Sequence, residues 1–394
     1  MNQGQISVVG QGYVGLPLAI AAAESGFAVT GIDTDPGRVN ALNQGHSPVA
    51  DIADAEIAAV LASGAYRASN TFESISGSEI VVICVPTPLD SHHQPDLSAV
   101  LAVTQNIAAH LSSGALVIIE STIAPGTTRE IIAPLLGTTD SFYLAYSPER
   151  IDPANNEWNI RNTPKLVAGL TKAAATKAVA FYSTFISRVE IGSSLEVIEV
   201  AKLLENSFRL INISFINEMA IFCERLGIDI QEVVKAAATK PYGFMPFFPS
   251  AGVGGHCIPV DPTYLAHKAR EIGTPSKFIE LANEVNRSLP DFFAGVALGK
   301  LGTLRDKSIL VVGIAYKPNV ADLRESPALG LISALRNEGA IVRWHDDLIA
   351  EWNGEKSAPI NEQSDLAILV NPHNSTAVSE LNAEQVLDTR GGYA

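Results

Sequence analysis

The sequence predicts an α/β protein with two parallel-sheet domains joined by a central helical region that contains one long helix. Short β-branched runs alternate with alanine-rich helical stretches in the first half, which is typical of βαβ units. From Ser194 to Leu226 proline is absent and apolar residues recur at helical spacing. The alternation of strands and helices then returns near the end. We expect domains at 1–193, 194–290 and 291–394, in line with a length of 394 residues.

The first sheet is expected from six runs rich in β-branched residues: Ile6–Gly10, Ala28–Asp33, Ile80–Pro86, Leu116–Thr122, Phe142–Ser147 and Lys165–Leu170. After the long helix we expect further helix, a loop at Pro241–Pro262, and helix again to about Ser288. Four more runs predict the second sheet: Ser308–Tyr316, Ala340–His345, Ser364–Asn371 and Gln385–Thr389.

The amino-acid composition excludes several classes of protein. Hydrophobic residues make up 47% and charged residues 18%, which is typical of a globular chain and excludes extensive disorder. The net charge of −15 argues against a nucleic-acid partner. No apolar run reaches the roughly 18–20 residues of a membrane span, and no signal peptide precedes Ile6. With only three cysteines, we expect a cytoplasmic protein without a disulfide framework.

A glycine motif follows the first predicted strand. Gly10, Gly12 and Gly15 form G-x-G-x-x-G at a strand-to-helix turn, where they permit a tight turn, close approach to a pyrophosphate and close helix packing. Asp33 lies close to the expected distance of about 20 residues downstream for the carboxylate that binds a ribose hydroxyl. The combination predicts a Rossmann-like dinucleotide site rather than a structural glycine turn. Asp33 and Asp35 would repel a 2′-phosphate, which favours NAD over NADP, and nothing indicates a flavin.

The second α/β domain is expected to be Rossmann-like without binding a dinucleotide. Its opening turn, Gly313 to Pro318, lacks the second and third glycines. Lys317 and Arg324 suggest instead that this domain holds an anionic group.

The loop from Gly252 to Pro262 places a thiol directly after three glycines. Cys257 and Asp261 would share one side of a helical turn, and a nearby cation would lower the pKa of such a thiol. A buried, inert cysteine is the ordinary alternative, which we retain for Cys84 and Cys223. His256 lacks further ligands at metal spacing, so no metal site is expected.

On the predicted long helix, Lys202 and Asn206 are one turn apart and share a face. An exposed ion pair between Glu199 and Lys202 is the alternative explanation for the lysine.

Taken together, the motifs closely resemble the nucleotide-sugar 6-dehydrogenases, the family of UDP-glucose, GDP-mannose and UDP-N-acetylhexosamine dehydrogenases. The resemblance covers nearly the whole chain. It rests on the glycine motif with the following Leu16-Pro17-Leu18-Ala19, on the glycine–cysteine loop, and on five further segments: Val85-Pro86-Thr87-Pro88, Glu120-Ser121-Thr122, Ser147-Pro148-Glu149-Arg150, Lys202-Leu203-Leu204-Glu205-Asn206 and Asp322-Leu323-Arg324-Glu325-Ser326-Pro327.

The resemblance implies oxidation of a sugar CH₂OH to a carboxylate with two NAD⁺ and one water. Cys257 would retain the aldehyde as a thiohemiacetal and then a thioester. Lys202 and Asn206 would stabilise the oxyanion. Asp261 would act as a base through water or set the protonation of Lys202, and Glu149 with Thr122 would position the hydrolytic water.

The resemblance also implies binding residues and an assembly. The expected NAD contacts are Gly10, Gly12, Tyr13, Val14, Gly15, Asp33, Arg38, Thr87, Thr122 and Arg324, although Arg38 could equally be a surface arginine. The expected sugar-nucleotide contacts are Glu149, Arg150, Lys202, Asn206, Phe247, Gly254, Tyr316, Lys317 and Arg390. Members of the family are oligomers, usually built on a dimer formed through the long helix, so a homodimer or a higher homo-oligomer is expected.

The cysteine loop resembles that of the N-acetylhexosamine branch. Within that branch, the segments Ser147–Pro153, Arg161–Lys165 and Phe247-Phe248-Pro249 resemble the enzymes that oxidise UDP-N-acetylglucosamine, which is the substrate we expect. The alternatives are UDP-N-acetylmannosamine or UDP-glucose. A two-electron hydroxyacid dehydrogenase would not need Cys257. A catalytically silent nucleotide-sugar-binding regulator would not need Lys202, Asn206, Asp261 and Glu149 together with it.

Overall fold

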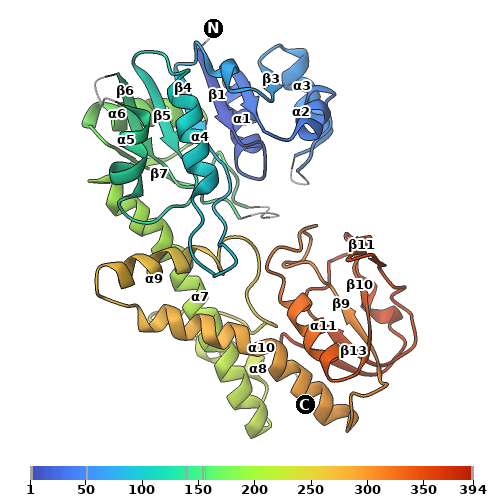
Figure 1. The fold of residues 1–394 in the computed structure, drawn as a ribbon. Helices are drawn as coiled ribbons and strands as arrows, with labels where there is room; N and C mark the ends of the chain where they lie inside the picture. Colours follow the sequence, from blue (N-terminus) through green and yellow to red (C-terminus); the bar gives the residue numbers. More distant parts are fainter. Residues whose placement is uncertain (1–2, 50–51, 138–140, 153–154, 156, 392–394) are drawn as a thin grey trace. The chain divides into compact units, whose positions relative to one another are not determined.

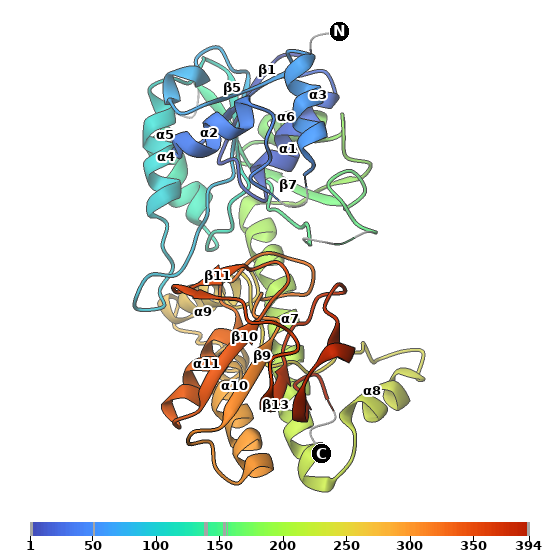
Figure 2. The same ribbon diagram turned by 90° about the vertical axis from the view of Figure 1, so that its right-hand side faces the viewer.

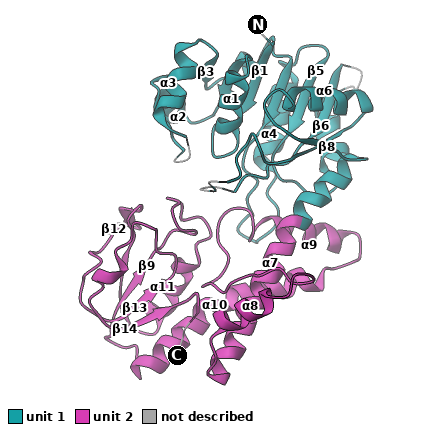
Figure 3. Ribbon diagram, turned by 180° about the vertical axis from the view of Figure 1, so that it is seen from behind, with its two compact units in different colours: residues 1–204 teal, residues 205–394 magenta. Residues whose placement is uncertain are grey.

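The computed structural model describes the chain except for residues 1–2, 50–51, 138–140, 153–154, 156 and 392–394. It divides into two compact units, residues 1–204 and 205–394, which Figure 3 shows in two colours. No helix in the described part of the chain is long and apolar enough to cross a membrane.

The first unit is built on a sheet in the order β3-β2-β1-β4-β5-β6-β7-β8. The strands are β1 (Gln5–Val9), β2 (Ala28–Ile32), β3 (Tyr66–Ser69), β4 (Ile80–Ile83), β5 (Ala115–Ile119), β6 (Phe142–Tyr146), β7 (Lys165–Gly169) and β8 (Val189–Ile191). Figure 1 follows them from blue to green along the chain. The strand order reverses between β1 and β4, and ligands of doubly wound sheets bind at such a switch point.

Two hydrophobic cores cover the two faces of this sheet. On one face, Ile6 and Val8 of β1 pack in a cluster with α1 (Gly15–Glu24) and α6 (Lys172–Tyr182). On the other face, Val9 packs with α4 (Ser98–Ala108) and α5 (Ala133–Leu136). Because both faces are buried, the strands are almost continuously apolar, which is why the runs stand out in the sequence. The remaining elements of the unit are α2 (Pro36–Asn43), α3 (Asp54–Ala62), a 3₁₀ turn at Phe72–Ile75 and a π-helical turn at Thr128–Ile132.

One strand of the sheet runs against its neighbour. β6 and β7 are antiparallel, with Tyr146 opposite Ala168, whereas the other described pairs of this sheet are parallel. As a result, β7 begins at the edge of the sheet where β6 ends. Lys165, its first residue, therefore lies at the carboxyl edge of the parallel strands.

The predicted long helix is confirmed as α7 (Leu195–Leu226), which starts in the first unit and continues into the second. The second unit adds α8 (Ile230–Ala238), α9 (Asp261–Glu271) and α10 (Lys277–Leu301). Helix α10 extends beyond the predicted end near Ser288 and contains Pro290. The sequence pattern ended the helix early because proline removes one backbone donor, a loss that packing of Leu289 and Phe293 in the core offsets here.

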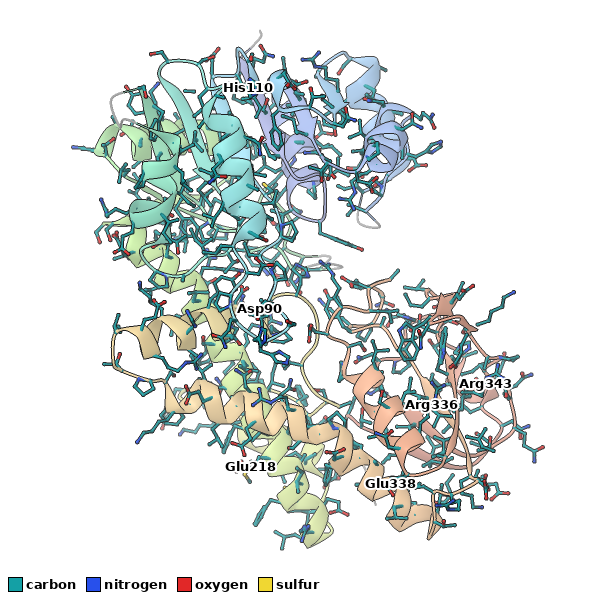
Figure 4. The ribbon with its side chains drawn as sticks, in the orientation of Figure 1. Asp90, His110, Glu218, Arg336, Glu338 and Arg343 are labelled. Carbon is teal, nitrogen blue, oxygen red and sulfur yellow. The ribbon has the colours of Figure 1, made fainter. Side chains whose placement is uncertain are left out.

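The second sheet has the order β10-β9-β13-β14 and is parallel throughout. Its strands are β9 (Ser308–Val312), β10 (Ile341–His345), β13 (Ser364–Leu369) and β14 (Ala383–Asp388), with α11 (Pro327–Asn337) and α10 packed on one face. Figure 2 shows α11 alongside β9 and β10. A small hairpin, β11 (Glu351–Trp352) with β12 (Glu355–Lys356), and a 3₁₀ turn at Val378–Glu380 complete the unit. Two arginines labelled in Figure 4, Arg336 on α11 and Arg343 on β10, form ion pairs with Glu355 and Glu362.

All ten predicted strands are present, but several end two to four residues earlier than expected. Val85 and Pro86 follow β4, and Ser121 and Thr122 follow β5, outside the ladder. These residues leave the sheet to form loops at its carboxyl edge. The short strands β3 and β8 were not predicted, because each lies toward the edge of the order and mixes polar with apolar residues.

Candidate active site

The turn after β1 requires two of its glycines for packing within the protein. Gly10 has φ +92° and donates its N–H to the Ile32 carbonyl at 2.7 Å. A Cβ on Gly15 would lie 1.8 Å from the Gly10 carbonyl oxygen. Side chains at these positions would push α1 away from the sheet, so the motif secures the tight turn that the sequence predicted.

The second glycine of the motif has a different environment. A Cβ on Gly12 would meet nothing within 4 Å in the described structure. This open space lies at the N-terminal end of α1, where partly buried Tyr13 and Val14 pack on the core. Backbone N–H groups at a helix start attract phosphate, so the cradle fits the pyrophosphate of a dinucleotide.

Asp33 directly follows β2 and is held by the glycine turn. Its carboxylate accepts the N–H groups of Gln11 at 2.9 Å and Asp35 at 3.0 Å. Arg38 Nη1 lies 3.0 Å from Asp33 Oδ2. The structure thus brings Arg38 to the acidic residue of the motif, where its charge balances that of the carboxylate.

Three further predicted residues follow the carboxyl ends of neighbouring strands. Thr87 follows β4, Thr122 follows β5 and Glu149 follows β6. Because these strands are parallel, the residues belong to one edge of the sheet, the edge that also carries Gly10 and Asp33.

Glu149 is fixed by its own loop. Its Oε1 atom accepts the N–H groups of Arg150 at 2.6 Å and Ile151 at 2.5 Å. Arg150 Nη1 donates to the Pro164 carbonyl at 2.6 Å, which links the loop after β6 to the start of β7.

A buried charged cluster lies behind Glu149, and the sequence analysis assigned no role to its members. Lys165 Nζ lies 2.6 Å from Glu120 Oε2 and 3.8 Å from Glu149 Oε2. The Tyr182 hydroxyl donates to Glu120 Oε1 at 2.5 Å. The sequence does show a charged residue at one end of each apolar run, Glu120 after Ile119 and Lys165 before Leu166. Polar residues often flank strands, however, so these two did not indicate a buried ion pair.

Burial and charge act against each other in this cluster. Burial raises the pKa of Glu120 to about 7, although Lys165 and Tyr182 favour the ionised form. Burial alone would lower the pKa of Lys165, but Glu120 and Glu149 together raise it, so Lys165 carries a full charge. Burial, then Glu120, raises the pKa of the nearby Cys84 thiol, which supports the structural role expected for that cysteine.

In the second unit, Cys257 and Asp261 are joined by a helical turn, as predicted. The Asp261 N–H donates to the Cys257 carbonyl at 2.8 Å, and α9 begins at Asp261. Asn206 Nδ2 on α7 donates to Asp261 Oδ2 at 2.6 Å in a buried contact. Lys202 precedes Asn206 by one turn of the same helix. Cys257 is partly exposed, whereas Cys223 is buried.

The glycines of the cysteine loop are needed for packing against the last α/β segment of the same unit. A Cβ on Gly254 would lie 2.7 Å from the Glu325 carbonyl oxygen, and one on Gly255 would lie 2.7 Å from the Tyr316 ring. The Gly255 N–H also donates to the Arg324 carbonyl at 3.0 Å. We expected these glycines to admit a ligand, and the structure shows that they also admit protein backbone and an aromatic ring.

The two cationic residues predicted to hold an anionic group, Lys317 and Arg324, lie between β9 and α11. Lys317 lies in the loop after β9. Arg324 Nε contacts both carboxylate oxygens of Asp322, at 3.0 and 2.9 Å. Burial raises the pKa of Asp322, but hydrogen bonds from Arg324 outweigh this and hold it below its ordinary value. Arg324 precedes the α11 N-cap, Ser326, with Pro327 at the first helical position, as predicted.

Two other predicted substrate residues have protein partners. Phe247 packs edge-to-face on Phe208 of α7, with ring centroids 5.9 Å apart. Arg390 follows β14 and pairs with Asp388 through two hydrogen bonds of 2.8 and 2.6 Å.

A second buried cluster that the sequence analysis missed closes the turn after β9. Asp346 follows β10, and its Oδ2 accepts the N–H groups of Ile314 and Ala315 at 2.9 and 3.0 Å. His373 Nε2 lies 2.8 Å from Asp346 Oδ1, and His373 Nδ1 accepts the Asn319 N–H at 2.8 Å. This arrangement fixes the loop that carries Lys317. Within the described residues, no group of three or more His, Cys, Asp or Glu could hold a metal ion.

Comparison with known proteins agrees with this arrangement. Residues 4–186 match the NAD binding domain of the UDP-glucose/GDP-mannose dehydrogenase family, 196–288 match its central domain, and 310–391 match its UDP binding domain. Fold and site thus define an oxidoreductase with NAD as its cofactor. The chain belongs to the UDP-glucose/GDP-mannose dehydrogenase family and is an NAD-dependent UDP-sugar dehydrogenase.

Individual relatives divide between two substrates. The chain is 35% identical to the UDP-N-acetyl-D-glucosamine 6-dehydrogenase of Pseudomonas aeruginosa, over 85% of this chain and 81% of the relative. It is 36% identical to the UDP-N-acetyl-D-mannosamine dehydrogenase of Pyrococcus horikoshii, over 88% and 84%. A solved structure of UDP-D-ManNAc dehydrogenase from Pyrococcus horikoshii matches with a TM-score of 0.90 at 32% identity, covering 98% of this chain and 95% of that one.

Proposed function

We propose that this protein oxidises the C6 hydroxymethyl group of UDP-N-acetylglucosamine to a carboxylate, consuming two NAD⁺ and one water. The observation that carries the proposal is the linkage of Cys257, Asp261 and Asn206. The turn from Cys257 leads directly to Asp261, which is hydrogen-bonded to Asn206 in the protein interior. A two-electron alcohol dehydrogenase would have no use for a partly exposed thiol in such a setting.

The proposed role of Cys257 is to retain the intermediate. Bound NAD⁺ supplies the hydride acceptor for each oxidation. After the first hydride and a proton leave the alcohol, Cys257 Sγ adds to the aldehyde carbon to give a thiohemiacetal. Loss of a second hydride, with the hydroxyl proton, gives a thioester. Water then adds, the C–S bond breaks, and the carboxylate and free thiol are released with a proton.

Lys202, Asn206 and Asp261 support the reacting oxygen in this proposal. An ammonium and an amide one helical turn apart can both donate to an oxyanion, which stabilises charge as it develops. Asp261, held by Asn206 at 2.6 Å, would act as a base through water or set the protonation of Lys202.

Glu149 and Thr122 are proposed to position the hydrolytic water. Among the described residues, Glu149 Oε2 is buried without a hydrogen-bond partner, and Lys165 lies 3.8 Å away. A buried polar atom without a hydrogen-bond partner costs free energy unless a ligand or a water molecule forms the missing hydrogen bond. This supports a role for Glu149 in holding a molecule of water.

The remaining predicted contacts divide between the two ligands. For NAD we propose Gly10, Gly12, Tyr13, Val14, Gly15, Asp33, Arg38, Thr87, Thr122 and Arg324. For the sugar nucleotide we propose Glu149, Arg150, Lys202, Asn206, Phe247, Gly254, Tyr316, Lys317 and Arg390. The choice of N-acetylglucosamine rests on the resemblance of the segments Ser147–Pro153 and Arg161–Lys165 and on the 35% identical Pseudomonas relative, with N-acetylmannosamine as the rival sugar.

We further propose a cytoplasmic homodimer formed through α7. Phe215 and Phe222, two turns apart on this helix, are 57% and 55% exposed. Large apolar side chains that repeat at helical spacing and face water are typical of a surface that another subunit covers.

The deciding experiment counts NADH formed per UDP-N-acetylglucosamine consumed, for the wild-type protein and for Cys257→Ser. We expect two NADH per sugar in the wild type. In the variant the four-electron reaction should fall by at least about a thousandfold, since a hydroxyl is a much weaker nucleophile than a thiolate. Cys223→Ser, at a buried cysteine outside the proposed site, is the matched control.

Other results have distinct meanings. One NADH per sugar in the wild type would contradict the covalent step. Turnover of UDP-N-acetylmannosamine or UDP-glucose, without turnover of UDP-N-acetylglucosamine, would keep the mechanism and refute the sugar. Binding of a UDP-sugar without NADH formation from any of the three would favour the silent regulator.

A further inference from the structure

The charged cluster behind Glu149 contains more acid than base. Two carboxylates, Glu120 and Glu149, lie against a single ammonium, Lys165. With both acids ionised the cluster has an uncompensated negative charge in a buried place. Isolated buried charge is costly, so such a cluster takes up a proton more readily than an exposed carboxylate does.

Geometry indicates which acid takes the proton. Glu120 is 1% exposed, and both of its oxygens contact cluster members, Lys165 and Tyr182. Glu149 is less deeply buried and faces Lys165 at the longer distance of 3.8 Å. The deeper carboxyl pays the larger desolvation cost for ionisation, in agreement with the pKa of Glu120 being raised to about 7.

We propose that Glu120 is a positioning residue whose protonation, relayed by Lys165, controls the charge that acts on Glu149 during hydrolysis of the thioester. The inference rests on the proposed role of Glu149. When Glu120 is ionised, Lys165 is balanced by it, and Glu149 is free to draw a proton from water. When Glu120 is protonated, the full charge of Lys165 acts on Glu149 and opposes that transfer.

The chemical step balances without another reactant. A water O–H bond breaks, its oxygen adds to the thioester carbon, and the proton passes to Glu149. The C–S bond then breaks and Cys257 leaves as a thiolate. Ionised Glu120 favours this step because a nearby negative charge strengthens a base.

Other titratable groups surround Glu120. They come from each element packed against it: Cys84 after β4, Glu149 after β6, Lys165 of β7 and Tyr182 of α6. Burial first, and Glu120 next, raise the pKa values of Cys84 and Tyr182 well above their ordinary values, so both keep their protons. Lys165 keeps its charge, and the pKa of about 7 places the titration of Glu120 itself in the neutral range.

The test compares kcat of Glu120→Gln with wild type across pH 6 to 9, under conditions where hydrolysis limits turnover. Glutamine mimics protonated Glu120. We expect equal rates near pH 6 and a deficit of about tenfold by pH 8, because wild-type Glu120 ionises in between. A purely structural role would lower the rate by the same factor at every pH, and that result would overturn the inference.

Tyr182→Phe gives a second, graded variant. It removes a donor that favours ionised Glu120, so the pKa of Glu120 should rise. The variant should therefore match the wild-type rate at low and at high pH, and its deficit should appear only in between, around neutrality. Glu73→Gln, an exposed carboxylate of the same unit, should show no deficit at any pH.

A measurement without turnover separates this inference from the proposed function. Carboxyl NMR of the protein labelled with ¹³C at glutamate Cδ should show the Glu149 resonance shifting as Glu120 titrates. That shift should vanish in Glu120→Gln. If it persists, the coupling is absent whatever the enzyme oxidises. If it vanishes while no UDP-sugar is oxidised, the coupling stands and the proposed function fails.

Discussion

Asp33 and Asp346 occupy equivalent positions in the two units, each directly after the strand that pairs beside the glycine turn. Both accept backbone N–H groups from that turn, Gln11 in one case and Ile314 with Ala315 in the other. The two aspartates differ in the side chain that contacts each carboxylate in addition to the glycine turn. Asp33 meets Arg38 at the surface, whereas Asp346 is closed off by buried His373. An aspartate at the equivalent position thus holds an open turn in the first unit and a loop closed by a buried histidine in the second.

Asp346→Asn should lower the free energy of unfolding by about 3 kcal/mol at pH 7. In either orientation the amide nitrogen would face donors. In place of Oδ1 it would meet His373 Nε2 and the N–H groups of Leu348 and Ile349, and in place of Oδ2 it would meet the N–H groups of Ile314 and Ala315. Urea unfolding followed by the fluorescence of buried Trp344 measures the loss. Asp306→Asn, at an exposed turn with positive φ that asparagine tolerates, is the control.

The pH dependence of this effect has a defined sign. Burial raises the pKa of Asp346, but hydrogen bonds from His373, Ala315 and Leu348 outweigh it and hold the pKa below the ordinary value. The stabilisation is therefore present above the ordinary aspartate pKa of about 4 and is lost as pH falls through the folded-state pKa. The difference between wild type and Asp346→Asn should shrink below about pH 4. An unchanged difference would contradict the assigned contacts.

At the scale of elements, the buried strands and the long helix were predictable from the sequence pattern. The two buried charged clusters, Glu120 with Lys165 and Asp346 with His373, were not. Buried strands are apolar runs and α7 is long and periodic, so both leave a local signal. The Glu120–Lys165 pair depends on β7 running antiparallel to β6, and no local pattern encodes strand direction. Asp346 and His373 are likewise joined only through the order β10-β9-β13.

Site residues show the same division. Gly10, Gly15 and the Cys257–Asp261 turn were predictable because each is a short motif with a local geometric requirement. The Asn206–Asp261 hydrogen bond joins α7 to the start of α9 and required the fold.

Helix α7 supports a prediction about assembly. Replacing Phe215 and Phe222 together by Glu should convert the proposed homodimer to monomer, because charge at a buried contact opposes association. Light scattering after size-exclusion chromatography gives the mass directly. Lys235→Glu, an exposed charge change on α8, should leave the mass unchanged. A wild-type mass of one chain would refute the dimer, and a double variant that stays dimeric would place the contact elsewhere.

At the scale of the whole molecule, each unit has its own sheet, core and glycine turn. The unit of residues 1–204 contains the match to the NAD binding domain, and the unit of 205–394 contains the match to the UDP binding domain. The chain carries a net charge of −15, so its anionic ligands depend on local donors rather than on long-range attraction. We propose the backbone N–H groups at Gly12 and cations such as Lys317 as such donors.

Hydrogen exchange of the intact protein should therefore separate the two ligands. NADH should slow exchange of amides in 10–15 and 33–38, since ligand binding suppresses local opening. UDP should slow exchange in 313–318. Mass spectrometry of peptic peptides gives both patterns in one experiment, with 98–108 of α4 as an internal reference. Protection of 313–318 by NADH alone would contradict the assignment of this turn to the sugar nucleotide.

The antiparallel strand β7 has a consequence for which segment of this protein tolerates variation. The connection from Ser147 to Pro164 starts after β6 and ends before β7, and both of its anchors lie at the carboxyl edge because the two strands are antiparallel. A crossover between parallel strands must travel the length of the sheet, but this connection returns to the edge it left. Its length can therefore vary without altering the ladder, although partly buried Ile160 packs on the first core. For a library that aims at a new sugar, this is the segment to randomise, with Glu149 and Lys165 kept as fixed ends.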